Sequence, residues 1–136
     1  MLITQHEGKL SNMMTTEKDR GMKYDGGKIL AAIPVKDFNL AIKAVAEVGT
    51  FGANKYKRSS WKTVPDAALR YEDALVRHQL EKEEVDYDEE SGLLHLAHMA
   101  WNALAILQLK LEEESIPLKD RPYFQLMDKE TNVTRN

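Results

Sequence analysis

The stretch GLLHLAHMAWNALAIL, residues 92–107, decides the fold. Its apolar side chains point in every direction around a helix, and two histidines, His95 and His98, interrupt them three residues apart. A helix that is apolar all round has to be covered on all sides. Three main helices in a chain of 136 residues can hardly do this. We therefore predict an all-α helical bundle that is completed by oligomerisation.

The flanking sequence predicts two further main helices. An apolar stripe over residues 35–48 indicates one helix, which we expect to end at Gly49 and Gly52. The sequence TVPD at residues 63–66 is typical of a helix start, and it indicates a helix that continues to about Glu83. The apolar helix itself is expected to begin between residues 88 and 91 and to end before Ser115. The other parts of a single domain over residues 1–136 are predicted to be a polar arm (1–20), a glycine-rich loop (21–34) and a polar tail (115–136).

The composition excludes several classes of protein. The chain has no cysteine and no apolar run of 18 residues, so we expect no disulfide, no thiolate metal site and no membrane span. The first residues carry no export signal, and a cytoplasmic location is predicted. The formal net charge is −3, and seven of the ten residues in EKEEVDYDEE (81–90) are acidic. The rest of the chain lacks a broad basic face, so no direct nucleic-acid binding is expected.

The acidic stretch 81–90 allows two interpretations, a solvated turn or a site for a hard cation. If it joins the helices on either side into an antiparallel hairpin, residues whose numbers sum to about 171 lie level, because both helices rise equally per residue. His95 then lies near Arg77 and His78, and His98 faces Asp73. Three of the four histidines converge at one end of the hairpin.

Asp73 shares a helical stripe with apolar residues at 69, 76 and 80, which predicts that its carboxylate faces the core. A buried carboxylate needs a cation, and imidazole with carboxylate suits a divalent ion. The predicted ion is Mn²⁺ or Mg²⁺. The candidate metal ligands are Asp73, Asp88, Glu90 and His98. The alternative for each residue taken singly is structural: a core histidine with one hydrogen bond, or an ordinary ion pair between Asp73 and Arg77.

Basic side chains and aromatic rings in the loops indicate a ligand with several negative charges and a flat ring. The alternative is that these lysines only solubilise the chain and that the aromatic rings fill the core. The candidate substrate-binding residues are Lys23, Asp25, Lys28, Lys55, Tyr56, Trp61 and Asn102.

Four motifs together resemble a known family. They are GMKYDGGK (21–28), GANKY (52–56) followed by a tryptophan, RYEDALVRH (70–78) and DEESGLLHLAHMAWNAL (88–104). In order and spacing they resemble phage proteins described as dATP/dGTP diphosphohydrolases. These belong to the MazG-like all-α nucleoside triphosphate pyrophosphohydrolases, and the chain looks most like the MazZ type. The resemblance covers about residues 21–109.

This resemblance implies hydrolysis of dGTP or dATP between the α- and β-phosphates, which gives the monophosphate and pyrophosphate. It also implies divalent metals, a homo-oligomer such as a dimer or tetramer, and a role in the phage nucleotide pool for 2-aminoadenine DNA, in the host cytoplasm. One departure concerns the ligands. Typical MazG-like enzymes carry E-x-x-E and E-x-x-D on successive helices, whereas this chain has only Glu72 and Asp73 on the first and His95-x-x-His98 on the second.

The hypothesis is therefore a metal-dependent nucleotide pyrophosphohydrolase. His78 or His95 would act as general base or donate to a phosphate, and Arg77 would neutralise charge on the leaving pyrophosphate. The purine would rest against Trp61, Tyr56 or Tyr24. Two alternatives stay open: a triphosphohydrolase that releases tripolyphosphate, and a non-enzymatic helical protein that binds a partner through its apolar helix.

Overall fold

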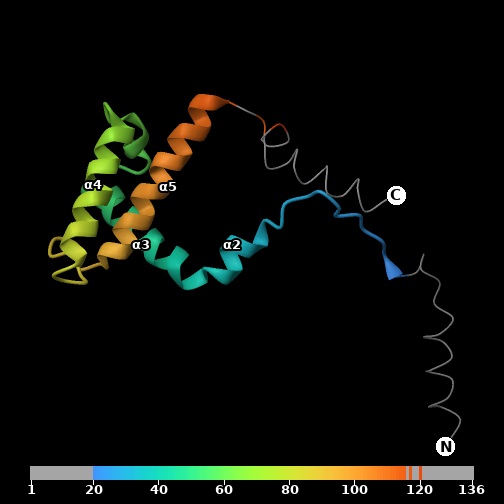
Figure 1. The fold of residues 1–136 in the computed structure, drawn as a ribbon, viewed down its shortest axis with the longest axis horizontal. Helices are drawn as coiled ribbons and strands as arrows, with labels where there is room; N and C mark the ends of the chain where they lie inside the picture. The colour runs from blue at the N-terminus through green and yellow to red at the C-terminus, as the bar shows by residue number, and fades with distance from the viewer. Residues whose placement is uncertain (1–19, 116, 118–119, 121–136) are drawn as a thin grey trace, which may run out of the picture. The chain divides into compact units, whose positions relative to one another are not determined.

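The computed structural model describes residues 20–115, 117 and 120, and this part of the chain is helical (Figure 1). It contains no strand, only an isolated bridge between Tyr87 and Leu94. The predicted all-α class is confirmed. The elements are α2 (Ala32–Asp37), α3 (Asn39–Lys55), the 3₁₀ helix η2 (Ser60–Thr63), α4 (Ala67–Lys82) and α5 (His95–Glu114).

Contacts within the chain separate residues 29–122, the helical unit described below, from a second unit that includes residues 20–28. The predicted arm over residues 1–20 and tail over residues 115–136 lie almost wholly outside the described residues. The single domain over residues 1–136 stays a prediction. No described helix combines the length and the hydropathy needed to cross a bilayer.

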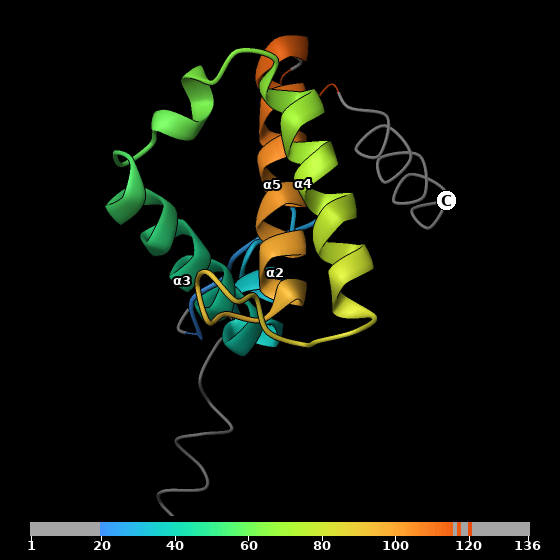
Figure 2. The same ribbon diagram turned by 90° about the vertical axis from the view of Figure 1, so that its left-hand side faces the viewer.

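The centre of the helical unit is the hairpin formed by α4 and α5. These two helices run antiparallel side by side, and α3 packs against α5 (Figure 2). The loop between α4 and α5 holds the acidic stretch, and it lies beside α3 (Figure 2). The hairpin predicted from the sequence is therefore confirmed, and it brings His78 level with His95.

The expected end of the first main helix at its glycines is wrong, because α3 continues through Gly49 and Gly52 to Lys55. The structure gives a reason for the first glycine. A Cβ atom at position 49 would lie 3.3 Å from Nε1 of Trp101, so glycine lets α3 approach α5 closely. At Gly52 a Cβ would meet nothing within 4 Å.

The start of α5 also differs from the prediction, because residues 88–94 form a closed turn before the helix begins at His95. The backbone N–H of Asp88 donates to Leu93 O at 2.7 Å, and that of Gly92 donates to Asp88 O at 2.8 Å. The N–H of His95 donates to Asp86 O at 2.9 Å, which satisfies one of the helix's first donors. The predicted end before Ser115 is confirmed.

Burial within this unit is unusual, because polar side chains are buried as deeply as apolar ones. The buried apolar residues are Val48, Ala97 and Ala105, and the buried polar residues are His78, His95, His98 and Asn102. The prediction that Asp73 shares a core-facing stripe is wrong for the single chain: Asp73 is exposed, and so are Leu69, Val76 and Leu80. Tyr71 and His78 face α5 instead, where their rings meet Trp101 and His95.

Candidate functional site

A cavity of about 960 Å³ opens between α3, η2, the α4–α5 hairpin and its loop. Its walls combine three kinds of side chain: aromatic rings, cationic groups, and histidines with carboxylates. The aromatic residues are Phe51, Tyr56, Trp61, Tyr71 and Trp101, and the cationic ones are Lys57, Arg70 and Arg77. The remaining charged or titratable residues are Asp73, His78, Glu81, Asp88, Glu90 and His98. The cavity can therefore receive a ligand that has both an apolar ring and charged groups.

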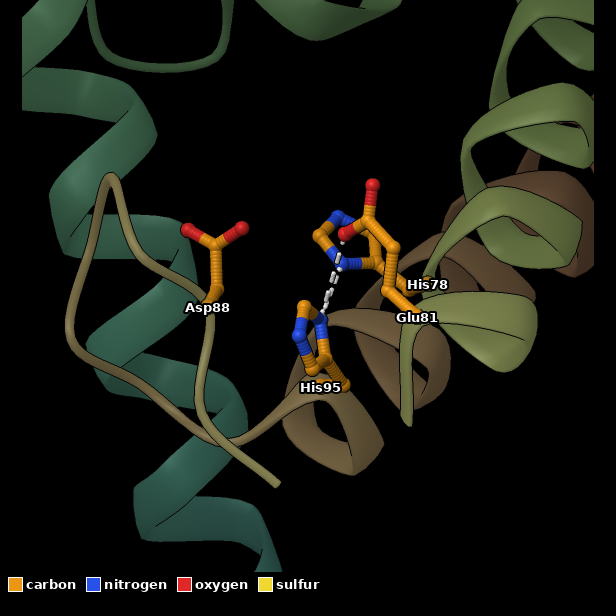
Figure 3. Close-up of side chains that lie close together, drawn as sticks. All are labelled: His78, Glu81, Asp88 and His95. Carbon is orange, nitrogen blue, oxygen red and sulfur yellow. Dashed lines mark hydrogen bonds and ion pairs between the residues drawn. The ribbon is translucent and has the colours of Figure 1, made fainter. Parts of the chain in front are cut away.

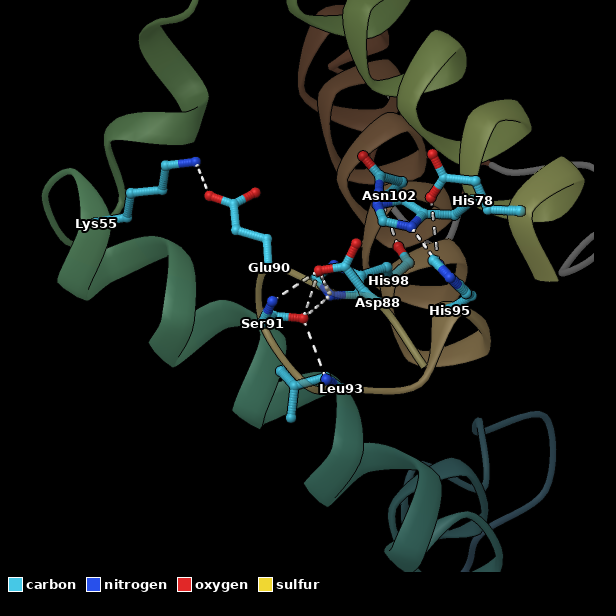
Figure 4. A network of polar contacts seen from close by, with 10 residues as sticks. Lys55, His78, Asp88, Glu90, Ser91, Leu93, His95, His98 and Asn102 are labelled. Atoms are coloured by element: carbon cyan, nitrogen blue, oxygen red, sulfur yellow. Dashed lines mark hydrogen bonds and ion pairs between the residues drawn. The ribbon is translucent and has the colours of Figure 1, made fainter. Parts of the chain in front are cut away.

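Three histidines meet beside this cavity, and we call His78, His95 and His98 the histidine cluster (Figure 4). The rings of His78 and His98 stack, with centroids 4.4 Å apart and planes 8° from parallel. Nδ1 of His78 lies 2.9 Å from Nδ1 of His95. The convergence predicted from the hairpin is confirmed, although His98 meets His78 rather than Asp73.

A hydrogen-bonded chain fixes the third histidine. The backbone N–H and the hydroxyl of Ser91 both donate to Oδ2 of Asp88 at 2.8 Å, and Ser91 Oγ lies 2.7 Å from Nε2 of His98 (Figure 4). The hydroxyl has one proton, and the carboxylate accepts it. His98 Nε2–H must then donate to Ser91 Oγ, which leaves Nδ1 of His98 as the basic nitrogen.

The electrostatics of the site keep the carboxylate charged and two of the imidazoles neutral. Burial alone would raise the pKa of Asp88, but the two hydrogen bonds from Ser91, together with the neighbouring His98 and His78, hold that pKa below its usual value. Burial lowers the pKa of His78, and the neighbouring His98 lowers it further. Burial also lowers the pKa of His98, against the opposing charge of Asp88. Neutral imidazole is the form that accepts a proton or binds a metal.

A candidate metal centre lies at the edge of the histidine cluster. We call His78, Glu81, Asp88 and His95 the metal cluster, because one ligand atom from each lies within 4.8 Å of the others (Figure 3). Oε2 of Glu81 is 3.7 Å from Nδ1 of His95. Two nitrogens and two carboxylate oxygens fit a divalent ion.

The aromatic part of the cavity is built from Trp61, Tyr71 and Trp101, which we call the aromatic cluster. The rings meet edge to face, with centroids 5.5 to 6.1 Å apart. The Tyr71 hydroxyl donates to Trp61 O at 2.6 Å and ties α4 to η2. Next to this cluster, Asn102 is 5% exposed, and its side chain donates through Nδ2 to His98 O at 2.8 Å (Figure 4). Its Oδ1 keeps its capacity to accept a hydrogen bond.

The structure brings most of the predicted site residues to one cavity. Nine of them line it: Tyr56, Trp61, Asp73, Arg77, His78, Asp88, Glu90, His98 and Asn102. His95 adjoins it through His78. Lys55, at the end of α3, is held by an ion pair with Glu90 of the hairpin loop. This proximity does not test the role of any of these residues, which all stay predictions.

The predicted glycine-rich loop (21–34) is divided by the structure, because residues 21–28 belong to the other unit and residues 32–34 begin α2. Lys23, Asp25 and Lys28 belong to the other unit, where Nζ of Lys23 lies 3.8 Å from Oδ1 of Asp25 and Lys28 N–H donates to Asp25 O. Their part in substrate binding stays a prediction from the sequence.

Sequence reasoning missed Glu81, Ser91 and Tyr71 as site residues. Glu81 follows His78 by three positions, a spacing that places both on one helix face, so this signal was available. Ser91 was recognisable only as part of a polar stripe, because its role depends on the closed turn at residues 88–94. Tyr71 gave no signal beyond that of an ordinary aromatic residue.

The fold and the site define a helical protein with a histidine–carboxylate cluster that could hold a metal ion, beside an aromatic cavity. Residues 18–120 match the family described as "dATP/dGTP diphosphohydrolase, N-terminal", and the chain belongs to this family. A protein of Salmonella phage PMBT28 named dATP/dGTP diphosphohydrolase is 37% identical over 90 residues, which are 65% of this chain and 29% of the phage protein. The chain thus spans less than a third of that relative. No solved structure matches the chain.

Proposed function

We propose that the chain hydrolyses purine deoxynucleoside triphosphates, dGTP and dATP, between the α- and β-phosphates to the monophosphate and pyrophosphate. The observation that carries the proposal is the division of one cavity into an aromatic part and a part with histidines, carboxylates and arginines. A nucleoside triphosphate has the same division, with a flat base at one end and a charged triphosphate at the other. Family membership supports this substrate class.

The base is proposed to lie against the aromatic cluster. Its flat ring would contact Trp61 and Trp101, which both line the cavity. Trp101 and Asn102 lie about one turn beyond His98 on α5, so this contact would place the phosphates toward the hairpin loop. Oδ1 of Asn102 can accept a hydrogen bond from a sugar hydroxyl or a base amino group. A nucleotide that donates to Oδ1 would be favoured over one that does not, because a buried acceptor without a hydrogen bond is unfavourable.

The geometry favours an exchange of two roles that the sequence suggested. His78 and His95 belong to the metal cluster, so we propose them as ligands rather than as the general base. His98, oriented by Ser91 and Asp88, is proposed to accept the proton of the attacking water at Nδ1. An ion in the metal cluster would polarise the phosphate oxygens and lower the pKa of that water.

The cations of the cavity are proposed to balance the triphosphate. Arg70 and Arg77 line the cavity from α4, and their forked guanidinium groups can bind phosphate oxygens in pairs. Lys55 now pairs with Glu90, and a bound phosphate would compete with that carboxylate for it. Charge that develops on the leaving pyrophosphate would be stabilised by these groups.

We also propose that the active form is a homo-oligomer. Large apolar side chains on the outer faces of α4 and α5 are exposed in the single chain, and a second copy would cover them. These residues are Leu69, Val76, Leu80, Leu96, Leu104 and Leu107. The role in 2-aminoadenine DNA stays a prediction from the resemblance.

The direct test incubates the 136-residue chain with each deoxy- and ribonucleoside triphosphate and with Mn²⁺, Mg²⁺ or a chelator, and separates the products by chromatography. Metal-dependent dGMP or dAMP with pyrophosphate is the expected result. Release of tripolyphosphate would replace the proposal by the triphosphohydrolase alternative. No turnover under any condition would overturn it, and would favour a non-enzymatic role for this part of the family.

Variants at His98 test the proposed base. Removal of a general base lowers turnover by about 10²–10⁴-fold, so His98→Gln should lower kcat in that range while it leaves Co²⁺ or Mn²⁺ binding in place. The control is Glu83→Gln, at an exposed residue that caps the end of α4 and lies outside the cavity. An unchanged kcat for His98→Gln would remove this residue from the mechanism.

A further inference from the structure

We infer that the metal cluster is selective for a transition-metal dication, bound through the imidazoles of His78 and His95, and that it takes such an ion in preference to Mg²⁺. The inference deepens the proposed function and rests on it only for the use of the ion. Half of the ligand atoms are imidazole nitrogens. Mg²⁺ prefers oxygen ligands and keeps several waters, whereas imidazole suits Mn²⁺, Co²⁺ and Ni²⁺ increasingly well and also suits Zn²⁺.

The spacing of the two nitrogens agrees with adjacent ligands of one ion. Two bonds of about 2.1 Å at a right angle place the ligand atoms about 3.0 Å apart, and the two Nδ1 atoms are 2.9 Å apart. Opposite ligands would lie about 4.2 Å apart, and no two of the four ligand atoms of the cluster are more than 4.8 Å apart. Small side-chain movements would bring the four ligand atoms to the separations expected around one ion.

A simple hydrogen bond between the two rings is the structural alternative. It would explain the 2.9 Å contact, with one imidazole as donor and the other as acceptor. It would not explain why the carboxylate of Glu81 lies at the same point, since its Oε2 is 3.7 Å from His95 Nδ1, beyond hydrogen-bond distance. The carboxylate of Asp88 is also held by Ser91. A cation accounts for all four groups at once.

The cluster can also be reached from a side away from the aromatic cavity. A second cavity of about 790 Å³ is lined by Glu81, Asp88 and His95 of the cluster. Its other walls are Glu84, Val85, Tyr87, Glu89 and Glu90. An acidic entrance raises the local concentration of cations. Because Glu81 and Asp88 line the first cavity as well, an ion bound between these residues would face both cavities.

The test measures metal binding without nucleotide. The metal-free chain is titrated with Mg²⁺, Mn²⁺, Co²⁺ and Ni²⁺ at equal concentrations, while thermal unfolding and, for Co²⁺, the visible absorption are recorded. Stabilisation is expected to increase from Mn²⁺ to Co²⁺ to Ni²⁺, and Mg²⁺ should leave the midpoint unchanged. The Co²⁺ bands should shift from those of the hydrated ion as nitrogen replaces water. Equal effects of Mg²⁺ and Co²⁺, or a hydrated Co²⁺ spectrum, would overturn the inference.

Two variants locate the ion. His95→Gln should weaken Co²⁺ binding by more than about 100-fold, since even a group that only supports a ligand contributes about 10–100-fold. Glu81→Gln should weaken it too, whereas Glu83→Gln, with the same change in charge two residues away, should not. Tight Co²⁺ binding by both His95→Gln and Glu81→Gln would place the ion elsewhere.

The outcomes also separate this inference from the proposed function. A chain that binds Co²⁺ through imidazole but hydrolyses no nucleotide would keep the inference and overturn the function. A chain that hydrolyses dGTP with Mg²⁺ and shows no imidazole-bound Co²⁺ would do the reverse.

Discussion

The inner and outer faces of the α4–α5 hairpin differ in a way that reverses the usual order of burial. On the inner face, at the loop end, three histidines and Asn102 are buried. On the outer faces, leucines are exposed, with Leu80 at 67% and Leu96 at 57%. Leucine is ordinarily among the most buried residues, and a buried polar group needs partners. In the single chain the buried residues are therefore gathered around the site, and large apolar side chains on the outer faces are exposed.

The strongest test of this comparison changes the outer face. Leu80→Lys should dissociate the proposed homo-oligomer, because it places a charge on a surface that a second copy would bury. Gln79→Lys, a charge of the same sign one residue away at another exposed position, is the control. The mass of each protein is measured by light scattering across a range of concentrations. The proposed oligomer would be contradicted by a wild-type chain that is monomeric at every concentration, together with a Leu80→Lys variant of unchanged stability. The leucines would then be stable while exposed to solvent.

The buried histidines of the inner face predict an effect of intermediate size, which is a dependence of folding stability on pH. Histidines in the unfolded chain have a pKa of about 6.5, and His78 and His98 have lower values in the folded chain. The unfolded state then binds more protons below pH 6.5, so stability is fully present above this pH and falls as the pH drops below it. The lowered pKa of Asp88 extends the loss to lower pH, below its ordinary value of 3.8.

Thermal unfolding in chelator between pH 8 and pH 4 measures this dependence. The midpoint should be flat at the alkaline end and should decrease below pH 6.5, and the decrease should be shallower in His78→Gln. A midpoint that rises as the pH falls from 6.5 would mean that the folded chain favours the charged imidazoles.

The parts of the fold that could be predicted from sequence are those fixed by period and spacing. The meeting of His78 with His95 required only equal rise along two antiparallel helices and the position of the acidic loop. The inward direction of Asp73 could not be predicted correctly, because an apolar stripe does not say whether this chain or a second copy covers it. Ser91 depended on backbone hydrogen bonds of the 88–94 turn, which no residue pattern reveals.

The two glycines of α3 provide the smallest test, and they show how packing overrides a local signal. Both were expected to end the helix, yet both lie inside it. Gly52→Ala should stabilise the chain by about 0.5–1 kcal/mol, because alanine favours a helix and its Cβ would meet nothing within 4 Å. At Gly49 the same gain is opposed by contact of the new Cβ with Trp101 Nε1 at 3.3 Å. Denaturant unfolding of the two variants compares them directly. Equal stabilisation by both would mean that α3 and α5 can separate slightly without loss, and that the aromatic cluster does not depend on their close approach.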